Sequence, residues 1–132
     1  YLEFEQEEPL IRYTITDGLF DGHTEKLKQE KNRLYLSADL LAKDALVFKH
    51  LLSKSINLRQ INSSFSIKVS LEGFPYLGIW TKPGQEQFLC IEPWCGLADK
   101  QGLPIAFNQK EGIIVLAPDA VFQQQFLTTI QH

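Results

Sequence analysis

The sequence contains no methionine, only two cysteines and three histidines, and no long apolar run. Two cysteines are too few for the disulfide framework of a small secreted domain. None of His23, His50 and His132 has a second ligand at metal-binding spacing, so no metal site is expected. Without an apolar stretch of about 18 residues, no transmembrane helix is expected. Phosphate-cradling glycine loops, dinucleotide fingerprints and G-x-S-x-G motifs are also missing.

The sequence has little excess charge of either sign. The chain has 16 acidic and 13 basic residues and a formal charge of −3, which argues against nucleic-acid binding because phosphate-backbone binders carry basic surfaces. A length of 132 residues fits one domain with a sizeable core. The acidic start has no signal-peptide layout, so a cytoplasmic location is expected. Because the chain begins at Tyr1, we expect it to be the interior of a longer protein.

Short stretches of alternating apolar and polar residues, separated by turn residues, make up most of the sequence. Strands are predicted at residues 1–5, 10–16, 24–29, 34–36, 56–61, 65–71, 76–81, 87–92, 112–116 and 121–130. Turns are predicted at Asp17-Gly18, Asp21-Gly22, 62–64, 82–84 and 118–119. Residues 39–44 resemble one helical turn, 46–52 fit helix by residue type and strand by context, and 96–110 read as a long loop. About ten short strands predict an all-β sandwich or large barrel.

The stretch from Phe74 to Asp99 holds one carboxylate in an unusual setting. Glu92 ends the apolar run Phe88-Leu89-Cys90-Ile91 and precedes Pro93. An acid in that position is partly desolvated, which favours its neutral form and suits proton transfer near pH 7. The proline restrains Glu92 to extended geometry, so we expect it at the end of a strand. A solvated edge residue or an ion-pair partner is the alternative interpretation.

The same region supplies the two residue classes that a sugar site requires, aromatic faces for the apolar side of the ring and polar groups for the hydroxyls. The aromatic candidates are Phe74, Tyr76, Trp80 and Trp94, and the acidic candidates are Asp44, Glu92 and Asp99. Cys90 and Cys95 flank the central Glu and are either reactive or two buried thiols of a reducing compartment.

Four segments together resemble a known family. They are LLAKDALVFKHLLSKSINL, FPYLGIWTKPG, FLCIEPWCGLAD and KEGIIVLAP, in this order. They are similar to the C-terminal half of the aldose 1-epimerase (galactose mutarotase-like) family, and most of all to its LacX-type bacterial proteins. The similarity runs over the whole chain, and the I-E-P-W and D-A-L segments joined by a Lys-Pro-Gly turn are specific.

The resemblance implies a mostly antiparallel β-supersandwich and an isomerase that interconverts the α and β anomers of a free aldose, with no cofactor. On the matching motif, Glu92 takes the position of the catalytic general base. Asp44 takes the position of an acid that binds sugar hydroxyls, and Trp80 and Trp94 are expected to contact the substrate. A non-catalytic sugar-binding or sensing protein, or a purely structural β-domain, is the alternative.

The resemblance also implies that residues 1–132 are the C-terminal portion of a single sandwich domain. The family's acid histidine and its substrate arginine lie in the N-terminal half, so this chain alone is expected to be nearly inactive. Half a sandwich leaves open edges and an exposed core face. The N-terminal half of the same protein, or a second copy, is expected to cover them.

Overall fold

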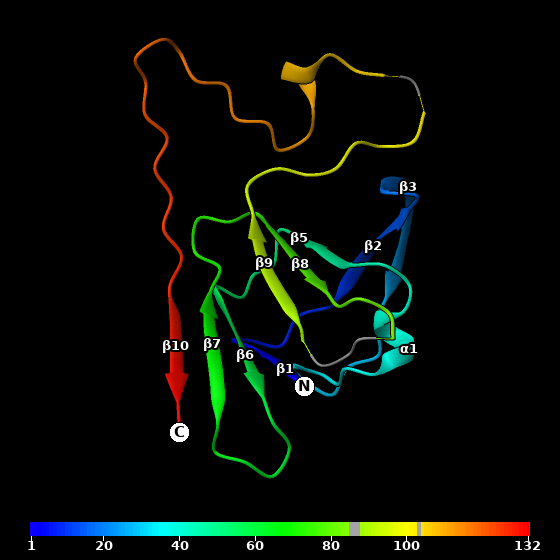
Figure 1. Cartoon of the computed structure of the whole chain (residues 1–132), viewed down its shortest axis with the longest axis vertical. Helices are drawn as coiled ribbons and strands as arrows, with labels where there is room; N and C mark the ends of the chain where they lie inside the picture. The colour runs from blue at the N-terminus through cyan, green and yellow to red at the C-terminus, as the bar shows by residue number, and fades with distance from the viewer. Residues whose placement is uncertain (85–87, 103) are drawn as a thin grey trace.

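The computed structural model describes residues 1–84, 88–102 and 104–132, and within them the chain forms two antiparallel five-stranded sheets. Sheet A has the strand order β10-β7-β6-β1-β4, and sheet B has the order β3-β2-β5-β8-β9 (Figure 1). Sheet A contains β1 (Leu2–Phe4), β4 (Arg33–Leu34), β6 (Ser55–Arg59), β7 (Ser66–Ser70) and β10 (Thr128–Gln131). Sheet B contains β2 (Ile11–Thr16), β3 (Leu19–Lys26), β5 (Leu46–Lys49), β8 (Tyr76–Trp80) and β9 (Cys90–Trp94). The predicted all-β sandwich is confirmed.

Helical structure is confined to two short elements in the described residues. The helix α1 (Ala38–Leu41) begins after Ser37, whose side chain accepts a hydrogen bond from the Leu40 backbone N–H and so caps the first turn. The 3₁₀ helix η1 (Phe107–Gln109) lies in the predicted long loop. The segment from 46 to 52, which fitted helix or strand, begins as the strand β5 because its residues pair with β8.

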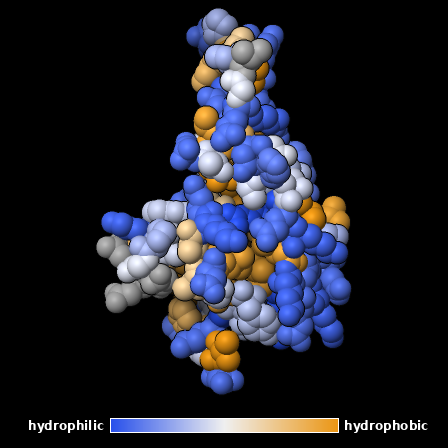
Figure 2. All heavy atoms as spheres, turned by 90° about the vertical axis from the view of Figure 1, so that its right-hand side faces the viewer, coloured by the Kyte–Doolittle hydropathy of each residue, from blue (hydrophilic) through white to orange (hydrophobic). Residues whose placement is uncertain are grey.

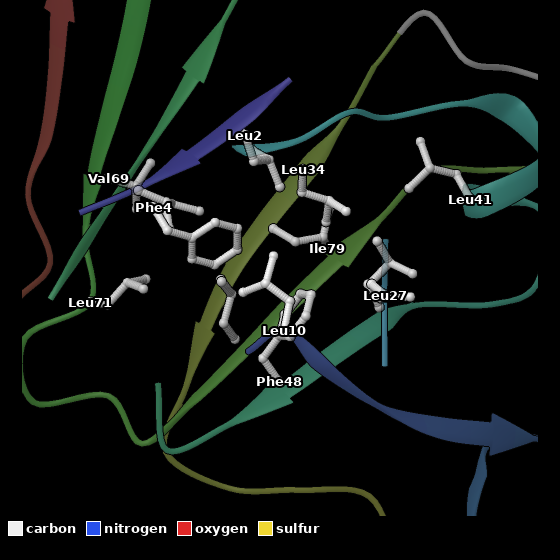
Figure 3. Packing of buried hydrophobic residues seen from close by; sticks show 13 residues of the cluster. Leu2, Phe4, Leu10, Leu27, Leu34, Leu41, Phe48, Val69, Leu71 and Ile79 are labelled. Atoms are coloured by element: carbon white, nitrogen blue, oxygen red, sulfur yellow. The ribbon is translucent and has the colours of Figure 1, made fainter. Parts of the chain in front are cut away.

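The hydrophobic core lies between the two sheets. Sheet A contributes side chains such as Phe4 and Val69, and sheet B contributes Phe48 and Ile79, which point toward one another (Figure 3). The Phe4 and Phe48 rings meet edge to face with centroids 5.9 Å apart. Because side chains alternate along a strand, the residues between these core positions on sheet B face away from sheet A. That outward side is called the outer face of sheet B below.

Asp21-Gly22 does not form the predicted turn but lies inside β3. Tyr13 pairs with Thr24 and Ile15 pairs with Phe20, so three residues of β3 lie opposite Thr14 and the register shifts. Gly22 has a φ of +83°, which a glycine adopts without strain. The Asp-Gly pair therefore makes a bulge in a longer strand that starts at Leu19, earlier than predicted.

Of the two strands predicted near the C-terminus, the first is wrong and the second is shorter than predicted. Residues 112–116 form no strand, and of the stretch from 121 to 130 only the end pairs, as β10 against β7. Both segments have strand-like sequences, but a strand forms only where a neighbour supplies hydrogen bonds. Figure 1 shows the orange part of the chain running beyond both sheets, and Figure 2 shows that end as a narrow projection above the body.

Candidate functional site

The outer face of sheet B brings the central residues of three strands into one row. The register places Val47 of β5 opposite Gly78 of β8, and Gly78 opposite Glu92 of β9. Tyr13 of β2 extends the row, because it pairs with Val47. Glu92 therefore stands at the end of a row of neighbouring side chains that crosses four strands, and Gly78 leaves the position beside it without a side chain.

Glu92 does not end its strand, as had been predicted, but is its central residue. The strand β9 continues through Pro93 to Trp94, and it starts at Cys90 rather than at Gln87, which lies outside the described residues. Because β9 is the edge strand of sheet B, a proline without an N–H can stand in it. Glu92 is half-buried on the outer face.

The nearest polar neighbour of Glu92 along the strand is Cys90. The two residues lie two positions apart on the same strand and share the outer face. Desolvation, followed by the negative charge and the hydrogen bond of Glu92, raises the pKa of Cys90. The raised pKa favours the neutral thiol of Cys90 over the thiolate. Both cysteines are free.

Trp80 and Trp94 lie on the same face and flank the Gly78 position. Trp94 pairs with Tyr76 and Trp80 pairs with Cys90, one step to either side of Glu92. Both indoles are half-buried and pack against the cluster formed by Phe20, Ala45 and Val47. The Trp80 ring meets the exposed Phe88 ring edge to face with centroids 5.9 Å apart. The structure thus brings Glu92, Trp80 and Trp94 together.

Asp44 lies at the margin of this face. It precedes β5, is exposed, and has a φ of +70°, a left-handed conformation that Asp tolerates better than most residues. Its carboxylate oxygen Oδ1 accepts a hydrogen bond of 2.6 Å from the backbone N–H of Ala45. Ala45 packs in the cluster with Trp80, so Asp44 is adjacent to the Trp80 end of the face. Its role toward a sugar stays a prediction.

A charged cluster that sequence reasoning missed lies at the opposite end of the face. The Nζ atom of Lys49 is 2.8 Å from Glu111, and Lys100 is 2.8 Å from the other carboxylate oxygen. The Lys49 side chain is only 6% exposed, and its ammonium lies 4.6 Å from the centre of the Tyr13 ring and 4.7 Å from that of Phe20. Lys49 and Glu111 are 62 positions apart, so no local pattern connects them.

The cluster fastens the loop after β9 to sheet B. The Phe20 backbone N–H donates to the Asp99 carbonyl, and the Gln101 N–H donates to the Phe20 carbonyl, each at 2.8 Å. Lys110 pairs with Asp99 at 2.8 Å within the same loop. Burial, followed by the charge of Glu111, raises the pKa of Tyr76, whose ring lies against Gly112. The loop therefore borders the site at the Tyr76 and Trp94 end.

Replacing Glu111 by Gln is expected to loosen this loop. Lys100 first, then Lys49, lowers the pKa of Glu111 from its ordinary value of 4.5, so its ionised form stabilises the fold above pH 4.5 and the effect is lost as the pH falls through the lower value. Amide exchange at Gln101 should accelerate about tenfold at pH 7 in the variant, because the largely buried Lys49 loses its carboxylate partner. In the wild type it should accelerate below pH 4.5, after correction for intrinsic exchange.

Glu7→Gln, a change at an exposed carboxylate, is the control and should leave Gln101 exchange unchanged. Equal protection of Gln101 in Glu111→Gln and the wild type would mean that the backbone bonds to Phe20 hold the loop without the ion pairs.

Each of the three histidines contacts a side chain other than Glu92. His23 lies 3.4 Å from Asp21, the His50 ring packs on Tyr76 with centroids 5.4 Å apart, and the His132 ring packs on Phe65 at 5.6 Å. None of these contacts involves Glu92. Within residues 1–84, 88–102 and 104–132, no three His, Cys, Asp or Glu side chains are grouped to hold a metal ion. Across the same residues, no helix has the length and apolar character needed to cross a membrane.

Two antiparallel sheets packed around one core define an antiparallel β-sandwich. A galactose mutarotase-like protein from Lactobacillus casei superimposes with a TM-score of 0.78 and 28% identity, covering 98% of this chain and 45% of that one. A galactose mutarotase related enzyme from Lactobacillus acidophilus gives a TM-score of 0.78 at 24% identity, covering 100% and 44%. The predicted fold is confirmed.

Sequence comparison gives the same relationship. The plasmid and chromosomal LacX proteins of Lactococcus lactis subsp. lactis are each 34% identical to this chain over 83 residues, which are 61% of this chain and 27% of those proteins. No protein-family profile matches the chain. The resemblance to the galactose mutarotase-like and LacX proteins is confirmed. The chain covers 45% of the Lactobacillus casei protein, so it spans less than half the length of that relative.

Proposed function

We propose that the protein is an aldose 1-epimerase-like isomerase that interconverts the α and β anomers of a free aldose. The observation that carries the proposal is the half-buried Glu92 on the outer face of sheet B, on a strand position between those of two tryptophans and opposite a glycine. A carboxylate so placed suits general base catalysis on a ligand that lies on the two indoles beside it. The galactose mutarotase-like relatives support a carbohydrate as that ligand.

The Glu92 carboxylate takes the proton of the anomeric hydroxyl. The C1–O5 bond then breaks as the ring oxygen receives a proton from an acid, which gives the open-chain aldehyde. Rotation about C1–C2 presents the other carbonyl face, and the reverse proton transfers close the ring. Trp80 and Trp94 cover the apolar side of the sugar, and Asp44 binds hydroxyls.

The acid that protonates the ring oxygen is proposed to come from outside this chain. His23, His50 and His132 make the contacts given above, and none of those contacts is with Glu92. We therefore propose that residues 1–132 are the C-terminal portion of one sandwich domain. The greater length of the solved relatives supports this division.

The remainder of that domain is the proposed cover for the apolar C-terminal segment, with a second copy as the alternative cover. Large apolar side chains are exposed there: Ile105, Phe107, Ile114, Val115, Leu116, Val121, Phe122, Phe126, Leu127 and Ile130. Such a set on one segment is typical of a surface that packs against further polypeptide. The edge strand β10 offers the same polypeptide free backbone groups. A cytoplasmic location fits the two free thiols.

A sugar-binding or sensing protein without turnover is the second candidate. The observation that favours it is the set of histidine contacts, which leaves Glu92 without an identified acid. Both candidates bind a sugar on the same aromatic face, so only the rate of anomer exchange distinguishes the enzyme from the binding protein.

Exchange spectroscopy by NMR on glucose and galactose is the direct test. The α and β resonances of each sugar should exchange faster with the full-length protein than in a buffer blank, and much more slowly with residues 1–132 alone. Sugar binding detected by tryptophan emission without exchange above the blank would favour the second candidate. No binding and no exchange would reject both.

A further inference from the structure

We propose that Gly78 is a positioning residue that seats the Trp94 indole flat on sheet B, as an aromatic floor for the apolar face of a pyranose ring beside Glu92. The inference rests on the proposed function and adds to it the residue that fixes the ring-binding surface. Glycine at this position is required by space, whereas the glycines of the turns are required by backbone conformation.

The indole occupies the volume that a side chain at position 78 would fill. An ideal Cβ at Gly78 would lie 2.5 Å from Cζ2, 2.7 Å from Cη2 and 3.0 Å from Cε2 of Trp94. Contacts under 3.0 Å require one partner to move. The three atoms belong to the six-membered ring of the indole, so that ring lies across the β8 backbone.

Backbone strain does not explain the glycine. Six glycines have positive φ values, and Gly78 is not among them. Alanine therefore suits the Gly78 backbone, and the three atoms nearest to its Cβ all belong to Trp94. A β-strand interior otherwise disfavours glycine, which packs nothing and loses more conformational freedom on folding than other residues.

The surroundings prevent the indole from settling deeper. Val47, next to Gly78 in the row, is fully buried, and Tyr76, opposite Trp94, is 5% exposed. Phe20 and Leu97 pack in the same cluster as the indole. A Cβ at position 78 therefore pushes the ring outward, toward the space above Glu92 that the sugar would occupy.

The chemistry of the floor selects its ligand. A flat indole beside a carboxylate suits a ring with C–H groups on one face and an ionisable hydroxyl at its edge, as in the pyranose form of a free aldose. Trp80, two residues after Gly78 on β8, pairs with Cys90 and so extends the aromatic surface on the other side of Glu92.

The test is Gly78→Ala in the full-length protein, with Gly96→Ala as the matched control. Gly96 also has no positive φ, and a Cβ there meets nothing within 4 Å. Gly78→Ala should raise the KM for galactose about five- to tenfold, the value of an aromatic contact, with kcat changed by less than about threefold. Gly96→Ala should leave both at the wild-type values.

A second pair of variants separates the floor from a general weakening of β8. Trp94→Phe removes the atoms nearest Gly78, so adding Gly78→Ala to Trp94→Phe should raise the KM for galactose little further. Emission of Trp94, recorded in a Trp80→Phe background, should shift on Gly78→Ala. The inference would be overturned if the effects of Gly78→Ala and Trp94→Phe on the KM were additive. An unchanged KM in Gly78→Ala would overturn it as well. A wild type that neither binds nor turns over aldoses would instead reject the proposed function.

Discussion

Glu92→Gln is expected to slow anomer exchange by the full-length protein by about 10²–10⁴-fold, the usual contribution of a general base. The amide has nearly the shape of the carboxylate but does not accept the anomeric proton. Its neighbours, Cys90 on the same strand and Gly78 opposite, should stay in place because the substitution changes little volume. Exchange spectroscopy on galactose measures the rate, with Glu72→Gln, at an exposed turn, as the control.

Binding should survive the same substitution. Trp80 and Trp94 cover the ring in the proposed complex, so the galactose affinity of Glu92→Gln, followed by tryptophan emission, is expected to change by less than about tenfold. Loss of rate with retained binding would place Glu92 in proton transfer and not in sugar recognition. An exchange rate equal to that of the wild type would reject Glu92 as the base.

The strands that the sequence predicted well are those whose pattern and neighbours agree. The predicted strand 65–71 contains β7, and the predicted strand 56–61 overlaps β6; the two pair across a short turn, so both halves of that hairpin are local in the chain. Residues 112–116 are as apolar as a buried strand but have no pairing partner among the described residues. Pairing with distant segments is not encoded in a local pattern, so the prediction failed there.

The candidate site was predictable only in part, for a related reason. The motif around Glu92 indicated an acid next to aromatic residues, and alternation alone puts Cys90, Glu92 and Trp94 on one face. The register between β8 and β9, which placed Gly78 under the Trp94 indole, was not visible in the sequence. Lys49 and Glu111 were missed because a single lysine in a strand carries no signal of a carboxylate 62 positions away.

Phe48→Ala is expected to destabilise the protein by about 3–5 kcal/mol, the typical cost of deleting a buried aromatic ring. Phe48 is 0% exposed, and its ring contacts Phe4 of the other sheet, so the cavity would open at the junction of the two sheets. A domain is stable by only about 5–15 kcal/mol, so the loss is a large fraction of the total. Urea unfolding, with the slope m held constant, measures it.

Phe48 also connects core to site, because its neighbours in β5, Val47 and Lys49, lie on the outer face. A cavity under β5 lets that strand shift, so the packing of the Trp94 indole and the ion pair between Lys49 and Glu111 should loosen together. Phe48→Leu, which keeps most of the volume, should cost less than about 1.5 kcal/mol. Phe107→Ala, at a ring 73% exposed in this chain, should be close to neutral when residues 1–132 are unfolded alone. If Phe48→Ala and Phe107→Ala lowered the free energy of unfolding by similar amounts, the C-terminal segment that contains Phe107 would hold the sheets together as much as the core between them does.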